Sequence, residues 1–156
     1  MNILSINSSN TSIKWQAVSF PCETILSSGY ITGIGTEFCY ALWQHADGHS
    51  KSQNIPDTTY SETVDFIKRR LNKGETFSED SIIVNGISFK IVISIDDKCK
   101  VSCMSTVPLY NPSYIKAIKI FRKTFSNIPL IVACVLPTNE ELIVARAAYE
   151  KLLTTA

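Results

Sequence analysis

Residues 2–20 of the chain, NILSINSSNTSIKWQAVSF, decide how the fold begins. The first part, NILSIN, is mostly apolar and leads into a turn of small polar side chains, SSNT. The second part alternates, with Ile13, Trp15 and Ala17 on one face and Lys14 among the residues of the other. A period of two is typical of a β-strand that is half covered by a core. The stretch therefore predicts a β-hairpin.

Patterns further along the chain predict more strands and a first helix. Strands are expected around residues 24–31 and 37–44, and the polar residues 46–56 are expected to form an exposed loop. A helix is expected to begin near Thr59, because Thr59 and Glu62 have the spacing of a capping box.

The later part of the chain predicts strands that alternate with helices. The expected elements are two short strands in residues 81–95 with a hairpin turn at Asn85-Gly86, a helix opening at Asn111-Pro112, a buried strand at 129–136 and a last helix at 138–153. The fold class expected from this order is α/β, a mixed sheet flanked by helices in a single domain.

Size and composition narrow the class of protein. The chain has 156 residues, of which 45% are hydrophobic and 19% charged, and its net charge is +1. One globular domain is expected, with no nucleic-acid partner, because no excess of positive charge would attract a polyanion. Neither a signal peptide nor an apolar run long enough for a membrane helix is recognised, so a cytoplasmic location without membrane contact is expected. The 5 cysteines lack metal-ligand spacing and are expected to be reduced thiols.

The first hairpin holds the best polar candidate site. Its first strand ends in Asn7, its turn is built of small hydroxyl and amide residues, and Lys14 follows on the second strand. Small side chains let backbone N–H groups approach an anion, and a lysine adds charge, so phosphate binding is one interpretation. The other is that this is an ordinary hairpin with a nearby lysine.

The same residues resemble the opening of the acetate kinase family. Residues 7–14, NSSNTSIK, are similar to the family's N-x-G-S-S-S-x-K turn, in which Asn7, Ser12 and Lys14 match and Ser9 replaces the glycine. Residues 108–112, PLYNP, are similar to the family's P-L-H-N-P.

A third match lies near the end of the chain. Residues 136–146, LPTNEELIVAR, are similar to the family's P-T-N-E-E-L-x-I-A-R. In the family a complete second domain precedes this segment, whereas here the strand 130–135 runs straight into it. The resemblance implies a ribonuclease-H-like first domain over residues 1–156, with the helix 138–153 returning to it and the second domain missing.

The resemblance also implies a chemistry. Acetate kinases transfer a phosphoryl group between ATP and acetate with Mg²⁺. By the matching positions, Asn7, Ser12 and Lys14 would bind phosphate, and Glu140 would be tied to the metal. ATP and Mg²⁺ are the expected cofactors if the family chemistry is retained, and otherwise none is expected. Glu140 near a helix start is equally an ordinary helix cap.

Departures from the family pattern set the expected function. Residues 83–90 hold no counterpart of the family's acyl-site arginine. Lys90 in this segment alternates with the apolar residues Phe89 and Ile91, which is typical of a solvated strand residue. The family's D-T-A-F-H is absent, and His45 and His49 flank a polar loop where surface positions are expected. We therefore expect an acetate kinase-like domain that is inactive or incomplete by itself. The alternative is a non-catalytic phosphate-binding or protein-interaction module.

Self-association or a partner chain is expected to cover the face that a second domain would meet.

Overall fold

The computed structural model describes residues 1–72, 81–92, 112–135, 149 and 152–153. Within these ranges the chain forms seven strands and two helices. The strands are β1 (Asn2–Ser8), β2 (Ser12–Ser19), β3 (Thr24–Thr32), β4 (Tyr40–His45), β5 (Ser50–Asn54), β6 (Gly86–Val92) and β7 (Leu130–Val135). The helices are α1 (Tyr60–Leu71) and α2 (Pro112–Thr124). The α/β class expected from the sequence is confirmed.

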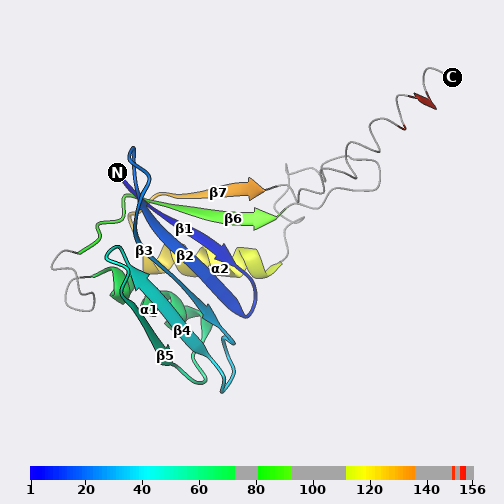
Figure 1. Cartoon of the computed structure of the whole chain (residues 1–156). Coiled ribbons are helices and arrows are strands. Elements are labelled where there is room, and N and C mark those ends of the chain that lie inside the picture. The colour runs from blue at the N-terminus through cyan, green and yellow to red at the C-terminus, as the bar shows by residue number, and fades with distance from the viewer. Residues whose placement is uncertain (73–80, 93–111, 136–148, 150–151, 154–156) are drawn as a thin grey trace.

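All seven strands join one mixed sheet in the order β5-β4-β3-β2-β1-β6-β7 (Figure 1). The strands β1 to β5 pair in an antiparallel meander, while β6 and β7 run parallel to β1. The hairpin expected from residues 2–20 is β1 and β2, with Asn7 opposite Lys14. The strand β1 is therefore the boundary between the antiparallel and the parallel halves.

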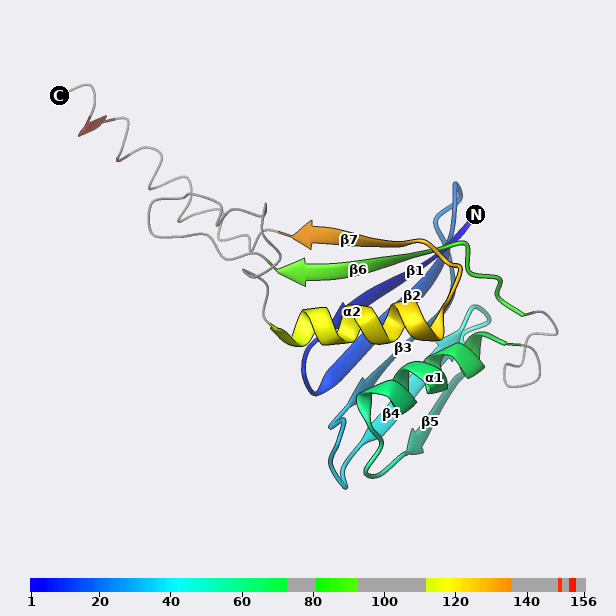
Figure 2. The same cartoon turned by 180° about the vertical axis from the view of Figure 1, so that it is seen from behind.

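Both helices pack on the same face of the sheet, as the two opposite views show (Figures 1 and 2). The core lies between this face and the helices. Alternate residues of the strands supply its sheet side, namely Leu4, Ile6, Ile13, Trp15, Ala17, Ile31, Ala41, Trp43, Ile87 and Phe89. Phe121 of α2 meets Phe89 edge to face, with the ring centroids 5.7 Å apart. Burial of each such large apolar side chain is worth about 1.5–3 kcal/mol, so this layer fixes which face of each strand points inward.

The first turn of α1 has the capping box that its sequence predicts. The Thr59 side chain accepts a hydrogen bond from the backbone N–H of Glu62 at 3.3 Å, and the Glu62 carboxylate accepts one from the backbone N–H of Thr59 at 2.8 Å. These bonds satisfy backbone donors that a helix start otherwise leaves unpaired. Because they favour the ionised carboxyl, the pKa of Glu62 is lowered.

The expectation of a loop over residues 46–56 is wrong in part. Residues Ser50–Asn54 form β5, an edge strand paired with β4. All five side chains are exposed, so the strand carries no alternation of apolar and polar residues. Backbone hydrogen bonds alone define it, and such a strand has no hydrophobic pattern by which to predict it.

The expected hairpin at Asn85-Gly86 is also wrong. Gly86 instead opens β6, which lies between β1 and β7. The backbone N–H of Asn85 donates to the carbonyl of Asn2 at 2.9 Å, and the N–H of Asn2 donates to Oδ1 of Asn85 at 2.8 Å. With β1 and β7 pairing along its two edges, β6 has no free edge for a hairpin partner.

The other face of the sheet is polar. Ser5 and Asn7 of β1, Lys14 and Gln16 of β2, and Lys90 of β6 alternate with the core residues and therefore point to it. No helix of the described part of the chain lies on this face. The expected helix 138–153 falls outside the described residues, apart from three of its positions. Neither described helix is long and apolar enough to cross a membrane.

Candidate functional site

The turn between β1 and β2 is closed by its own hydroxyl groups. The backbone N–H of Ser9 donates to the carbonyl of Ser12 at 2.9 Å. The Ser9 and Ser12 hydroxyls share a hydrogen bond of 2.7 Å, and the backbone N–H of Thr11 donates to the Ser9 hydroxyl at 3.3 Å. The result is a narrow loop with small polar side chains at the carboxyl end of β1.

Two other segments hold this turn from outside. Tyr60, the first residue of α1, places its phenolic oxygen 2.5 Å from the Ser8 hydroxyl oxygen. The Ser8 hydroxyl donates to the carbonyl of Ser9 at 3.1 Å, so the phenol is the donor to Ser8. Burial raises the pKa of Tyr60 to about 12, which keeps this donor protonated at neutral pH. From the other side, the backbone N–H of Ile34 donates to the carbonyl of Thr11 at 3.0 Å.

The glycines that flank Ile34 make this second anchor possible. Gly33 and Gly35 have φ angles of 70° and 82°. Backbone with positive φ is costly for residues with a Cβ, and glycine adopts it freely. The turn that the sequence predicts at these glycines is confirmed, and its role is to bring Ile34 against the hairpin turn.

A hollow of about 510 Å³ opens beside the turn. We call it the turn pocket; its lining residues are Asn7, Ser8, Ser9, Ser12, Ile13, Lys14, Tyr30, Thr32 and Tyr114. The structure thus brings together the three phosphate candidates of the sequence, Asn7, Ser12 and Lys14. Hydroxyl and amide donors with one lysine form a donor set suited to a small anion.

The turn pocket lies where elements of the parallel half end. Figure 2 shows α2 beginning at the edge of the sheet where β1 and β6 finish. Tyr114, in the first turn of α2, lines the pocket, and its ring meets Phe89 edge to face at 6.3 Å. The amino end of a helix carries partial positive charge, which favours an anion nearby. The carboxyl edge of parallel strands is also the usual place for ligands in α/β sheets.

Several residues of this site escape the sequence patterns. Tyr60 and Tyr114 are far from the turn in sequence, and each looks like a core residue of an amphipathic helix. The alternation around Lys90 predicts a solvated strand residue; the side chain is half-buried on β6 and is paired with Asn7 in the register of β1 and β6. Glu140, the candidate metal ligand, lies outside the described residues. Among the described residues, no group of three His, Cys, Asp or Glu side chains could hold a metal ion.

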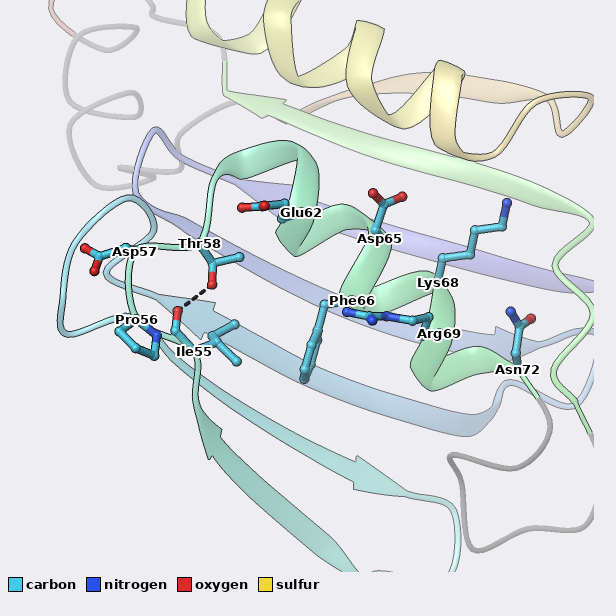
Figure 3. A pocket seen from close by; sticks show the side chains of 10 residues that line it. All are labelled: Ile55, Pro56, Asp57, Thr58, Glu62, Asp65, Phe66, Lys68, Arg69 and Asn72. Carbon is cyan, nitrogen blue, oxygen red and sulfur yellow. Dashed lines mark hydrogen bonds between the residues drawn. The ribbon is translucent and has the colours of Figure 1, made fainter.

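A larger groove of about 760 Å³ runs along α1 (Figure 3). It is lined by Ile55, Pro56, Asp57, Thr58, Glu62, Asp65, Phe66, Lys68, Arg69 and Asn72. Three carboxylates and two cations share this lining, so the groove has no dominant charge to select a ligand. Glu62 is already engaged in the helix cap, and the Thr58 hydroxyl donates to the carbonyl of Ile55 at 2.5 Å. The groove is therefore the weaker candidate, despite its size.

The expectation that both histidines lie at the surface is wrong for one of them. His45 ends β4 on the helix-facing side and is only 5% exposed, because it continues the alternation of Ala41 and Trp43. Burial lowers the pKa of its imidazole. His49 is exposed, with Nδ1 at 3.0 Å from the Asp47 carboxylate. Neither histidine lines the turn pocket.

Comparison with known proteins agrees with the resemblance seen in the sequence. No family model matches the chain. Acetate kinase from Bacillus subtilis is 26% identical over 144 residues, covering 83% of this chain and 35% of the relative. Acetate kinase from Acholeplasma laidlawii is 29% identical over 140 residues, covering 82% and 35%. The chain thus spans about a third of the length of these relatives.

Solved structures show the fold. Porphyromonas gingivalis acetate kinase superposes with a TM-score of 0.68 at 14% identity, covering 85% of this chain and 37% of that one. A propionate kinase from Francisella tularensis superposes with a TM-score of 0.65 at 18% identity, covering 85% and 36%. The similarity to acetate kinases and the ribonuclease-H-like α/β fold expected from it are confirmed. The partial coverage of the relatives is consistent with their first domain.

Proposed function

We propose that this chain is an acetate kinase-like domain that binds phosphate in the turn pocket and does not complete phosphoryl transfer by itself. The observation that carries the proposal is the convergence of Asn7, Ser12 and Lys14 on one hollow at the carboxyl end of β1. These are the three positions at which the sequence resembles the family's phosphate-handling turn.

The chemistry of the turn pocket supports phosphate as its ligand. The Ser9 and Ser12 hydroxyls share one hydrogen bond, so one of their two protons remains for an anion. Asn7 adds amide N–H donors, and the ammonium of Lys14 adds a positive charge on the neighbouring strand. No carboxylate lines the pocket to repel an anion.

Catalysis needs groups that this chain does not supply at the matching positions. In-line phosphoryl transfer depends on several donors that converge on the charge of the transition state. Residues 83–90 hold no arginine, and the family's D-T-A-F-H is absent from the sequence. Loss of one transition-state donor typically costs about 100–1000-fold in rate. With several absent, turnover of ATP and acetate by this chain alone falls below detection.

The family chemistry would add ATP and Mg²⁺, with Glu140 as the candidate metal residue. The described residues contain no acidic cluster that fits a metal ion. The phosphate site proposed here is built from the hydroxyl, amide and ammonium groups that line the turn pocket.

A second candidate function is a non-catalytic module that binds a partner. The polar face of the sheet favours it, because Ser5, Gln16 and Lys90 present polar groups there. The chain, taken as one domain over residues 1–156, would present that face to a second copy or to another chain. Light scattering over a wide range of concentration tests self-association, and a monomer throughout would count against a second copy.

Calorimetric titration with inorganic phosphate tests the main proposal. The matched pair of variants is Lys14→Ala in the turn pocket and Lys119→Ala on the exposed side of α2, since both remove one positive charge. We expect heat of binding in the wild type and in Lys119→Ala, and a loss of at least about tenfold in affinity in Lys14→Ala. Equal weakening in both variants would contradict a specific site. Acetyl phosphate formation from ATP, acetate and Mg²⁺ would contradict the second half of the proposal.

A further inference from the structure

We infer that this chain pairs with a second copy of itself through the groove along α1, with Glu37 and Phe38 of each copy docked against Arg69 of the other. The groove and the turn pocket share no lining residue, so this pairing is independent of the proposed phosphate site. Three features of the structure support it. They are an exposed aromatic side chain on an anchored loop, the order of the charges along the groove, and the way the two match in a two-fold arrangement.

Phe38 is a large apolar side chain that the core does not use, since it is 78% exposed. The loop that carries it is joined to the segment before α1 by two backbone hydrogen bonds of 2.9 Å. In these bonds the N–H of Asp57 donates to the carbonyl of Thr36, and the N–H of Ile55 donates to the carbonyl of Cys39. Because Ile55 and Asp57 line the groove, Phe38 is held near the end of the groove at which α1 begins. Aromatic side chains presented in this way are typical anchors of protein interfaces.

The charges along the groove are separated by sign. Asp57 and Glu62 lie where α1 begins, and Lys68 and Arg69 lie near its end (Figure 3). Seven residues of helix separate Glu62 from Arg69, which corresponds to roughly 10 Å. Glu37 adds an exposed carboxylate on the loop beside the first of these ends. The groove thus has an acidic end and a basic end.

A two-fold axis across the middle of α1 brings opposite charges together. The two helices then run antiparallel, so the acidic end of each groove meets the basic end of the other, and every contact occurs twice. Glu37 faces Arg69 of the other copy in this arrangement. Asp65 lies near the axis and four residues before Arg69 on the same helix, so its charge is offset within its own copy. Parallel helices would instead set like charges against each other.

Arg69 matches both residues of the loop that it would meet. A guanidinium stacks on aromatic rings and also pairs with carboxylates, so one arginine can contact Phe38 and Glu37 together. Arg69 is exposed, and no ion pair is found for it in the part of the chain that the structure describes. The apolar side chains of Ile55 and Phe66 also line the groove, between the two contacts. Both halves of the interface are present on one chain, which favours a second copy over an unrelated partner.

Sedimentation velocity over a wide range of concentration, at constant ionic strength, measures the dissociation constant of the pair. We expect the wild type to dimerise reversibly. The variants Phe38→Ala, Glu37→Arg and Arg69→Glu are each expected to raise the dissociation constant at least about tenfold. Two controls place charge elsewhere, namely Lys119→Glu on the exposed side of α2 and Ser5→Arg on the polar face of the sheet. Both are expected to stay within about twofold of the wild type.

A mixture of Glu37→Arg and Arg69→Glu separates lost pairing from lost folding. In a mixed pair one contact is the native one, and in the other the two substituted side chains meet with their charges exchanged. Both contacts are then between opposite charges, whereas each variant alone sets like charges together. We expect the equimolar mixture to dimerise within about threefold of the wild-type affinity.

Four outcomes would overturn this pairing. They are a wild type that stays monomeric at every concentration, a dimer that survives all three interface variants, equal weakening by Lys119→Glu, and a mixture that fails to associate although both variants keep the wild-type circular dichroism spectrum. A dimer that only Ser5→Arg dissociates would place the second copy on the polar face of the sheet instead. None of these outcomes bears on phosphate binding, which the calorimetric titration tests separately.

Discussion

Replacement of Tyr60 by phenylalanine removes the outer anchor of the hairpin turn without changing the core. The phenolic oxygen lies 2.5 Å from the Ser8 hydroxyl, while the ring packs edge to face on Phe121 at 6.4 Å. Phenylalanine keeps the ring contact and loses only the hydrogen-bond donor. Ser8 is 6% exposed, so water replaces the lost donor poorly.

The magnitude follows from the bonds that remain. The Ser8 hydroxyl keeps its own donation to the carbonyl of Ser9, so the variant leaves an acceptor unpaired but no donor. A net loss of about 1 kcal/mol in the free energy of unfolding is expected, within the usual range for one hydrogen bond. For a chain of this size that corresponds to a fall of roughly 2–4 °C in Tm. Because the turn then holds Ser9 and Ser12 less firmly, phosphate affinity is expected to fall about threefold.

Urea denaturation and calorimetric phosphate titration measure the two effects. The control is Tyr40→Phe, which removes a phenol from β4 at a position for which no side-chain hydrogen bond is found in the described structure. Alkaline titration adds a third readout. The folded pKa of Tyr60 is about 12 against 10 in the unfolded chain, so its contribution to stability is present below about pH 10 and is lost as pH rises toward 12. Tyr60→Phe with unchanged stability and unchanged phosphate affinity would refute the anchoring role.

Other substitutions test the helix cap, the buried histidine and the packing of the sheet. Thr59→Ala removes the capping box with Glu62 and is expected to cost about 1 kcal/mol by urea denaturation; an unchanged midpoint would contradict the cap. Burial lowers the pKa of His45 from its usual 6.5. The contribution of the neutral imidazole to the free energy of unfolding is therefore present above that pH and is lost as the pH falls through the folded pKa. His45→Gln is expected to flatten the fall in urea midpoint between about pH 7 and about pH 5, and an unaltered slope would argue against a buried neutral imidazole. Gly29→Ala places a Cβ 2.4 Å from the Trp15 ring and is expected to lower stability by about 1–3 kcal/mol; a thermal melt like that of the wild type would contradict this packing.

The local periodicities of the sequence carry much of the fold. The alternation of Ile13, Trp15 and Ala17 correctly predicts a strand with one buried face, and all three are 1% exposed or less. The spacing of Thr59 and Glu62 correctly predicts a capped helix start. Both signals depend on neighbours within one element, so no knowledge of the tertiary structure is needed to use them.

Contacts between distant elements are what the sequence does not reveal. The polar edge strand β5 has no hydrophobic period, and the dipeptide Asn85-Gly86 resembles a hairpin turn although parallel pairing of β6 with β1 and β7 overrides it. The same parallel register brings Lys90 opposite Asn7. Asn7 and Lys90 are 83 positions apart in sequence, and no local pattern encodes their pairing. The candidate site is thus predictable in its Asn7, Ser12 and Lys14 part and not in the residues that support or extend it.

Backbone amide chemical-shift mapping during titration with inorganic phosphate tests the central claim most directly. It reports the location of binding as well as its occurrence. We predict that the largest shifts fall on residues 7–14, with smaller shifts at Tyr30 and Tyr114, which line the same pocket. No shift at residues 7–14, or shifts concentrated in the groove along α1, would contradict a phosphate site at the hairpin turn.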